Sequence, residues 1–204
     1  MRKFFNSFLS RFSDRQIYLS IVLGITTAVF LNQLIDLLKL KTIFTSYTDN
    51  IQGGMFMYPL LTGIIIYGIL TPLGEEIAFR FILFGRLRLY MATGAAAVFS
   101  SIIFGIYHGN FIQFVYAFCF GILLSFLYWR FESLIAPIFA HSAANILVYS
   151  TASAGGIGVL STLYGQLISL IISGILTFAI IKKIYQNRPK KKKLNRRLPI
   201  FPQR

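Results

Sequence analysis

The stretch LYMATGAAAVFSSIIFGIYHGNFIQFVYAFCFGILLSFLYW (residues 89–129) contains no lysine, arginine, aspartate or glutamate. A helix that crosses a membrane needs about 20 consecutive apolar residues, so this stretch is long enough for two such helices. A second uncharged stretch, residues 133–181, is long enough for two more. Across the chain 56% of residues are hydrophobic and 13% are charged, too few charges to cover the surface of a soluble domain. The sequence therefore predicts an all-α, polytopic transmembrane helical bundle.

The apolar segments between the charged residues predict where the membrane spans lie. The second segment contains Pro72 and Gly74, residue types that kink or break helices. If that segment is one long bent helix the bundle has six spans, and if it breaks at Pro72 into two membrane-crossing pieces it has seven. We expect a single bundle domain, residues 1–184, with no internal repeat. The predicted spans are residues 17–38, 55–90, 92–108, 111–128, 133–150 and a last span ending at residue 181, with loops at residues 39–50 and 153–158.

The net charge of +14 is concentrated at the chain ends. Ten of the twenty lysines and arginines lie from Lys182 onward, and four others precede the first apolar segment. Basic clusters beside spans mark cytoplasmic ends and are attracted to anionic lipids. Six spans place both termini on one side together with Arg86, Arg88 and Arg130, which this rule favours. Residues 185–204 are predicted to be a disordered, basic cytoplasmic tail, and nucleic-acid binding is the less favoured reading of its charge.

Two further features of the sequence bear on its compartment. Cys119 is the only cysteine and lies in an apolar segment, so we expect a core or lipid-facing side chain. The first apolar segment is too long for a signal peptide and shows no small-residue cleavage site, so we expect a retained span. An integral membrane protein is predicted.

Ionisable side chains inside the predicted spans are few, and each is costly there. Placing a charged residue in hydrocarbon costs about 2.5–3.5 kcal/mol by insertion scales, so a charged residue within a span suggests a functional role. Glu76 and Arg80 are four residues apart and can pair on one helix face. Glu75 then points about 100° away, toward a different neighbour. The full set is Glu75, Glu76, Arg80, His108 and His141, with Asp36 near the end of the first span.

The hairpin of the second and third spans predicts which of these groups meet. Glu75 lies sixteen residues before Met91, where the chain turns, and His108 lies seventeen after it. Antiparallel helices of equal rise place these two residues at nearly the same depth. We expect His141 within one or two turns of that level.

A carboxylate and an imidazole at one depth can share and activate a water molecule. Glu75 would take the proton from the water while His108 holds or relays it, which is general-base catalysis. His141 and Asn145 are four residues apart on one face and are donors of the type that stabilises an oxyanion. The pair formed by Glu76 and Arg80 would orient the site.

Each of these residues taken alone also has a structural interpretation. Glu76 and Arg80 form an architectural ion pair in many proteins, and His108 beside Gly109 is typical of an interfacial residue. Asn145 alone is most simply an interhelical hydrogen-bond donor. Their grouping in three short segments that can converge favours the functional interpretation.

Three motifs in these segments resemble those of a known family. GEEIAFR (Gly74–Arg80) has the pattern EExxxR, FGIYH (Phe104–His108) has FxxxH, and HSAAN (His141–Asn145) has HxxxN. Their order resembles the CPBP family, which contains the type II CAAX prenyl endopeptidases and the bacterial bacteriocin-processing or immunity (Abi) proteins. The resemblance covers about residues 72–149 and implies a protein of a bacterial plasma membrane.

The resemblance implies a role for each residue of the motifs. Glu75 corresponds to the catalytic glutamate, His108 to its water-activating partner, and His141 and Asn145 to the oxyanion stabilisers. Glu76 and Arg80 complete the first motif in a supporting role. No cofactor is expected, and zinc is disfavoured because zinc sites normally have three protein ligands and no HExxH is present.

The predicted function is therefore that of an intramembrane endopeptidase. Its partners would be membrane lipids and a membrane-associated peptide or lipidated protein substrate, with no nucleic acid. The alternative is a non-enzymatic bacteriocin-immunity or scaffold protein of the same fold. A small transporter is a third class, which the lack of an internal repeat disfavours.

Overall fold

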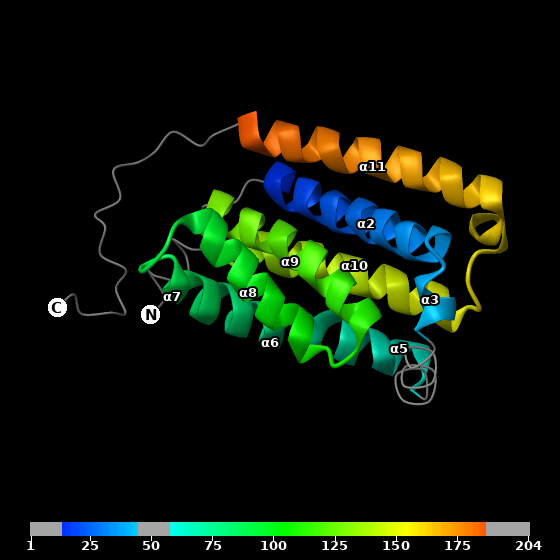
Figure 1. Ribbon diagram of the computed structural model, residues 1–204, viewed down its shortest axis with the longest axis horizontal. Coiled ribbons are helices and arrows are strands. Elements are labelled where there is room, and N and C mark those ends of the chain that lie inside the picture. Colours follow the sequence, from blue (N-terminus) through cyan, green and yellow to red (C-terminus); the bar gives the residue numbers. More distant parts are fainter. Residues whose placement is uncertain (1–13, 45–57, 187–204) are drawn as a thin grey trace.

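The computed structural model describes residues 14–44 and 58–186, and every regular element within these ranges is a helix (Figure 1). This confirms the all-α prediction. A composite helix, residues 60–87, consists of α5 (Leu60–Gly63), the π-helical stretch η2 (Ile64–Leu70), α6 (Thr71–Glu75), a second π-helical stretch η3 (Glu76–Phe84) and α7 (Gly85–Leu87). The other elements are α2 (Asp14–Leu37), α3 (Leu40–Ile43), α8 (Thr93–Tyr107), α9 (Phe111–Phe131), α10 (Ile135–Ser153), the 3-10 turn η4 (Gly158–Ser161) and α11 (Leu163–Gln186).

Four helices in the described part of the chain are long and apolar enough to cross a membrane: α2 from Arg15, the composite helix, α9 and α11. The helix α8 is apolar but spans only Thr93–Tyr107, and α10 interrupts its apolar sequence with His141 and Asn145. The structure therefore supports an integral membrane protein with four candidate spans.

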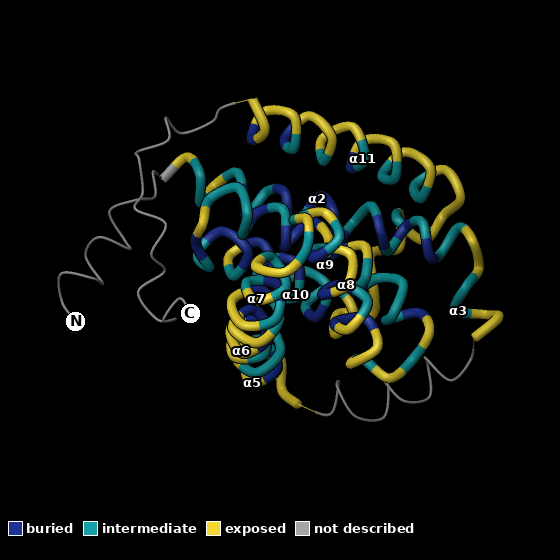
Figure 2. The backbone as a smooth tube through the Cα atoms, turned by 60° about the vertical axis from the view of Figure 1, so that its left-hand side comes forward, coloured by how far each residue is buried: buried dark blue, intermediate teal, exposed yellow. Residues whose placement is uncertain are grey.

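The helices lie side by side around a core at the centre of the bundle. α2 packs against α9, α10 and α11, and α10 also packs against the composite helix. Figure 1 shows α11 at one edge and the composite helix at the opposite edge. In Figure 2 the burial is greatest between these two edges. The central core consists mainly of Leu23, Ala28, Leu31, Phe120, Leu124, Leu127, Ala140, Ala144, Ile180 and Ile184.

The outer faces of the two edge helices are apolar and exposed. Leu61 and Ile82 on the composite helix are more than half exposed, as are Ile175 and Phe178 on α11. Helices that are hydrophobic on their outer as well as their inner face are typical of membrane spans. These outer faces are therefore suited to contact with lipid.

Close contact between α2 and α10 depends on a glycine. A Cβ atom at Gly24 would lie 2.0 Å from the backbone oxygen of Ala140. Membrane helices use small residues in this way to bring their backbones together. Because His141 follows Ala140, this contact fixes α10 against α2 directly beside the site.

The composite helix continues through Pro72 without the break that was one of the two predicted outcomes. The N–H of Thr71 donates to the carbonyl of Ile66, five residues back, as a π-helix requires. In that register the next donor would serve Tyr67, but proline has no N–H. The side chain of Asn145 on α10 donates to this carbonyl instead, at 2.9 Å. A neighbouring helix thus satisfies the group that Pro72 leaves without a backbone partner, and the helix continues.

Three other expectations can be compared with the structure. The predicted loop of residues 39–50 begins with the single turn α3, which starts after Lys39 in a left-handed conformation. Asp36 pairs with Lys41 at 2.6 Å, as a helix-end residue. Cys119 is exposed on α9, which is the lipid-facing alternative. Most of the predicted tail, residues 187–204, and residues 45–57 lie outside the described residues.

Candidate functional site

The register between the composite helix and α8 agrees with the predicted depth of the site. The rings of Phe79 and Phe104 are in contact, with centroids 4.9 Å apart. Phe79 lies four residues after Glu75, and Phe104 lies four residues before His108. In antiparallel helices this contact places Glu75 and His108 at one level, one turn from the two phenylalanines.

Both glutamates converge on a single imidazole. Nδ1 of His141 lies 2.8 Å from Oε1 of Glu76, and Nε2 lies 3.6 Å from Oε2 of Glu75. All three side chains are largely removed from solvent, with relative exposures of 0% for Glu76, 4% for His141 and 9% for Glu75. Glu75 contacts His141, a neighbour other than the Arg80 that pairs with Glu76, as expected, but Glu76 contacts His141 as well. The ring of His141 lies between the two carboxylates, and its nitrogens face one each.

The predicted pair of Glu76 and Arg80 is present and fully buried. Nε of Arg80 lies 3.2 Å from Oε2 of Glu76, and both side chains are at most 1% exposed. The guanidinium carbon lies 4.2 Å from the ring centroid of Phe104, a cation–π geometry. Glu76 thus contacts Arg80 with one oxygen and His141 with the other, and the arginine compensates its charge.

His108 is held by the last turn of its own helix. Its Nδ1 lies 2.8 Å from the carbonyl oxygen of Phe104, and because a carbonyl only accepts, Nδ1 is the nitrogen that carries hydrogen. Nε2 is then the nitrogen with a lone pair. The chain turns immediately afterward at Gly109, which has a φ of 74°, and Asn110 caps α9 by accepting from the N–H of Gln113. The imidazole therefore has a fixed tautomer on a short, well-defined turn.

A polar stripe on α10 bonds to the composite helix at two levels and to Tyr58, just before that helix, at a third. His141 bonds to Glu76, Asn145 donates to the carbonyl of Tyr67, and the hydroxyl of Tyr149 donates to the carbonyl of Tyr58 at 3.1 Å. The three side chains are spaced four residues apart, which is one face of a helix. His141 and Asn145 were predicted site residues, whereas Tyr149 was not, although the same four-residue spacing extends to it.

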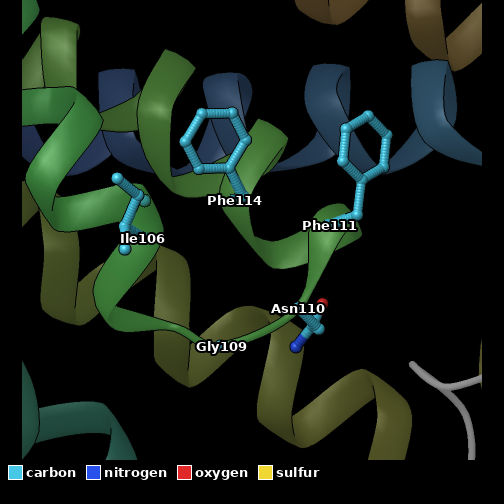
Figure 3. A pocket seen from close by; sticks show the side chains of 6 residues that line it. Ile106, Gly109, Asn110, Phe111 and Phe114 are labelled. Atoms are coloured by element: carbon cyan, nitrogen blue, oxygen red, sulfur yellow. The ribbon is translucent and has the colours of Figure 1, made fainter.

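An open surface pocket of about 370 Å³ lies between the end of α8 and the start of α9 (Figure 3). Gly105 and Ile106 line this pocket, whereas the ring of Phe104, on the same helix, contacts Arg80 and His141 of the site. The lining residues are Gly105, Ile106, Gly109, Asn110, Phe111 and Phe114.

Within the described ranges, no three or more histidine, cysteine, aspartate and glutamate side chains are grouped so that they could hold a metal ion. In the Glu75, Glu76 and His141 group, Nδ1 of His141 is bonded to a carboxylate. This hydrogen bond fixes the ring of His141, as carboxylates do for imidazoles in many sites.

Comparisons with known proteins show what the region around the site is similar to. Residues 57–147 match the family described as "Type II CAAX prenyl endopeptidase Rce1-like". A Bacillus subtilis (strain 168) protein named "Putative membrane peptidase YdiL" is 39% identical over 85 residues, which are 42% of this chain and 35% of that protein. The chain thus aligns with about a third of the length of this relative. It matches no solved structure. All six candidate site residues lie within residues 57–147, the part of the chain that is similar to this family.

Proposed function

We propose that the protein is an intramembrane endopeptidase that hydrolyses a peptide bond of a membrane-associated peptide or protein. The observation that carries this proposal is the convergence of Glu75 and Glu76 on His141 inside an apolar bundle. Such charges are costly among membrane helices, and proteins that retain them generally use them. Acid–base chemistry on a water molecule is what two carboxylates and two imidazoles supply.

Glu75 is the general base of the proposed reaction. It is the more exposed of the two glutamates, and its contact with Nε2 of His141, at 3.6 Å, is longer than a hydrogen bond. The carboxylate takes a proton from water as the oxygen attacks the scissile carbonyl, and the proton then passes to the departing amine. The lone pair on Nε2 of His108, at the same depth, holds the second hydrogen of the water.

His141 and Asn145 are the proposed donors to the oxyanion that forms on the carbonyl. Glu76 holds the imidazole through Nδ1, and Nε2 of His141 lies on the side of Glu75. The proposed donor form of His141 is the imidazolium, in which both ring nitrogens carry hydrogen. The amide of Asn145 has two hydrogens, of which one is bonded to Tyr67, and the other serves the oxyanion. Donors held in this way stabilise the transition state without reorganising. This mechanism uses no metal, and zinc remains the less favoured alternative.

The proposed topology has six spans, which are the four longer helices together with α8 and α10. The start of α2, the end of α11 and α7 lie toward one end of the bundle in Figure 1. These ends carry Arg15, Lys182, Lys183, Arg86 and Arg88, and the positive-inside rule makes that end cytoplasmic. A seventh span would need a break at Pro72, and the composite helix is continuous there.

The proposal is tested with the full chain purified in detergent or lipid and a panel of fluorogenic peptides. Glu75→Ala and His108→Ala are compared with wild type and with Glu132→Gln, an exposed glutamate that ends α9. We expect cleavage by wild type and Glu132→Gln only. Cleavage that persists in both site variants contradicts the assignment.

The same variants separate the enzyme from a binding protein of this fold. In a bacterial strain whose phenotype depends on the gene, wild type and Glu132→Gln are expected to complement its loss while Glu75→Ala is not. Complementation by Glu75→Ala and His108→Ala would instead favour the immunity or scaffold function, which needs no turnover.

A further inference from the structure

One aromatic ring touches three side chains of the site and a neighbouring phenylalanine. The ring of Phe104, 1% exposed, has its centroid 4.9 Å from that of His108 and 6.0 Å from that of His141. Arg80 lies over its face at 4.2 Å, and Phe79 packs against it at 4.9 Å. These contacts come from α8, α10 and the composite helix, so the ring lies where the three helices meet.

The geometry of the ring contacts is specific. Phe104 is nearly perpendicular to both imidazoles, with interplanar angles of 87° for His108 and 86° for His141. Edge-to-face contacts at such distances are favourable beyond the area that they bury. The backbone carbonyl of the same residue also accepts from Nδ1 of His108. Phe104 therefore constrains His108 through both its ring and its backbone, and His141 through its ring.

The contact with Arg80 adds an electrostatic component. In the described part of the chain the guanidinium nitrogens of Arg80 have no hydrogen-bond acceptor, and its only ion pair is that of Nε with Glu76. The π face of Phe104 is the remaining favourable surface for this buried cation. A ring removed from this position would release Arg80, and with it the carboxylate that fixes His141.

We propose that Phe104 is a positioning residue that holds the imidazoles of His108 and His141 and the guanidinium of Arg80 in one arrangement. The consequence for turnover rests on the proposed function, whereas the arrangement of the histidines does not. The phenylalanine of FxxxH then acts on chemistry through its neighbours and touches no reacting atom.

The chain offers a direct measurement, because it contains only two histidines. Histidine-selective ¹³C labelling of the full chain in micelles gives one ring signal for His108 and one for His141. In Phe104→Leu both signals are expected to move. In Phe84→Leu, a buried ring that contacts Tyr128 and Arg88, neither moves. In Phe120→Leu, whose ring contacts His141, only that signal moves.

Activity supplies the second readout on the same variants. Phe104→Leu is expected to lower kcat by about 10- to 100-fold with KM nearly unchanged, the cost of misplacing a catalytic group by a fraction of an ångström to one ångström. Phe84→Leu, with a similar loss of buried volume, keeps kcat within about threefold. Cooperative unfolding, compared with that of Phe84→Leu, shows whether Phe104→Leu is folded. If it is not, Phe104→Met replaces it, because methionine fills the volume without an aromatic ring.

Unmoved histidine signals in a folded Phe104 variant would overturn the proposal, as would moved signals with unchanged kcat. If the wild-type protein cleaves no peptide, the peptidase assignment fails on its own. The histidine spectra then still decide whether Phe104 sets the arrangement of the two rings.

Discussion

Nδ1 of His141 and Oε1 of Glu76 are 2.8 Å apart and join two helices across 65 residues of sequence. The other oxygen of Glu76 faces Arg80, and the other nitrogen of His141 faces Glu75. This buried chain of four side chains links the ion pair of the first motif to the proposed base. Glu76 therefore has a role in both the stability and the chemistry of the site.

Glu76→Gln is expected to lower both stability and activity. The variant leaves the buried guanidinium of Arg80 uncompensated, at a cost of about 3–5 kcal/mol. Replacing both partners, as in Glu76→Leu with Arg80→Met, is expected to recover most of the stability, because an apolar pair of similar volume is well tolerated. Activity is not expected to recover, since nothing then orients His141. Unfolding in mixed micelles and peptide cleavage measure the two effects, and a double variant that regains activity would contradict the role of Glu76.

Pro72 and Asn145 are expected to be energetically coupled. Asn145→Ala removes the donor to the Tyr67 carbonyl, which costs about 1–3 kcal/mol for a buried group left unpaired. Pro72→Ala introduces an N–H five residues after Tyr67, so the cost of Asn145→Ala should be smaller in that background. A double-mutant cycle on unfolding in micelles measures the difference. Equal costs in the two backgrounds would exclude this account of the unbroken helix.

Gly24→Ala is expected to destabilise the protein and reduce its activity. The added Cβ meets the backbone of Ala140 at 2.0 Å, and overpacking of this kind costs about 1–3 kcal/mol. Because Ala140 precedes His141, the displacement reaches the site. Gly94→Ala on α8 is the matched control, since nothing lies within 4 Å of its Cβ. A Gly24→Ala protein as stable and active as the control would show that the close approach of α2 and α10 is unimportant.

Chelators are expected to leave peptide cleavage unchanged. The proposed mechanism activates water with a carboxylate and an imidazole, so incubation with EDTA or phenanthroline followed by gel filtration should not lower kcat. Loss of activity that added zinc restores would replace this mechanism with a metal-dependent one.

The sequence predicted the parts of this structure that depend on periodicity and composition. Uncharged stretches located the helices to within a few residues. Counting residues from the turn near Met91 placed Glu75 and His108 at one level, and the contact of Phe79 with Phe104 agrees with that register. Pairing of Glu76 with Arg80 followed from their spacing. These features are local or depend on one short hairpin.

Long-range geometry was not accessible in the same way. Counting residues on an ideal α-helix turned Glu75 away from Glu76, whereas an imidazole from α10 reaches both. The two π-helical stretches have no sequence signature that propensity reveals, and the donation from Asn145 to Tyr67 depends on a helix 78 residues away. Phe104 was recognised as part of a motif, but its contacts with both histidines emerge only when three helices are packed together.

The rate of the Glu75→Gln protein tests the central claim most directly. Glutamine keeps the size of the side chain and removes its basicity, so kcat on a cleaved peptide should fall by about 10²- to 10⁴-fold, the usual contribution of a general base. The stability of this variant should not fall, because it removes a buried charge. A Glu75→Gln protein that cleaves the peptide within about threefold of the wild-type rate would contradict the claim that this carboxylate activates the water.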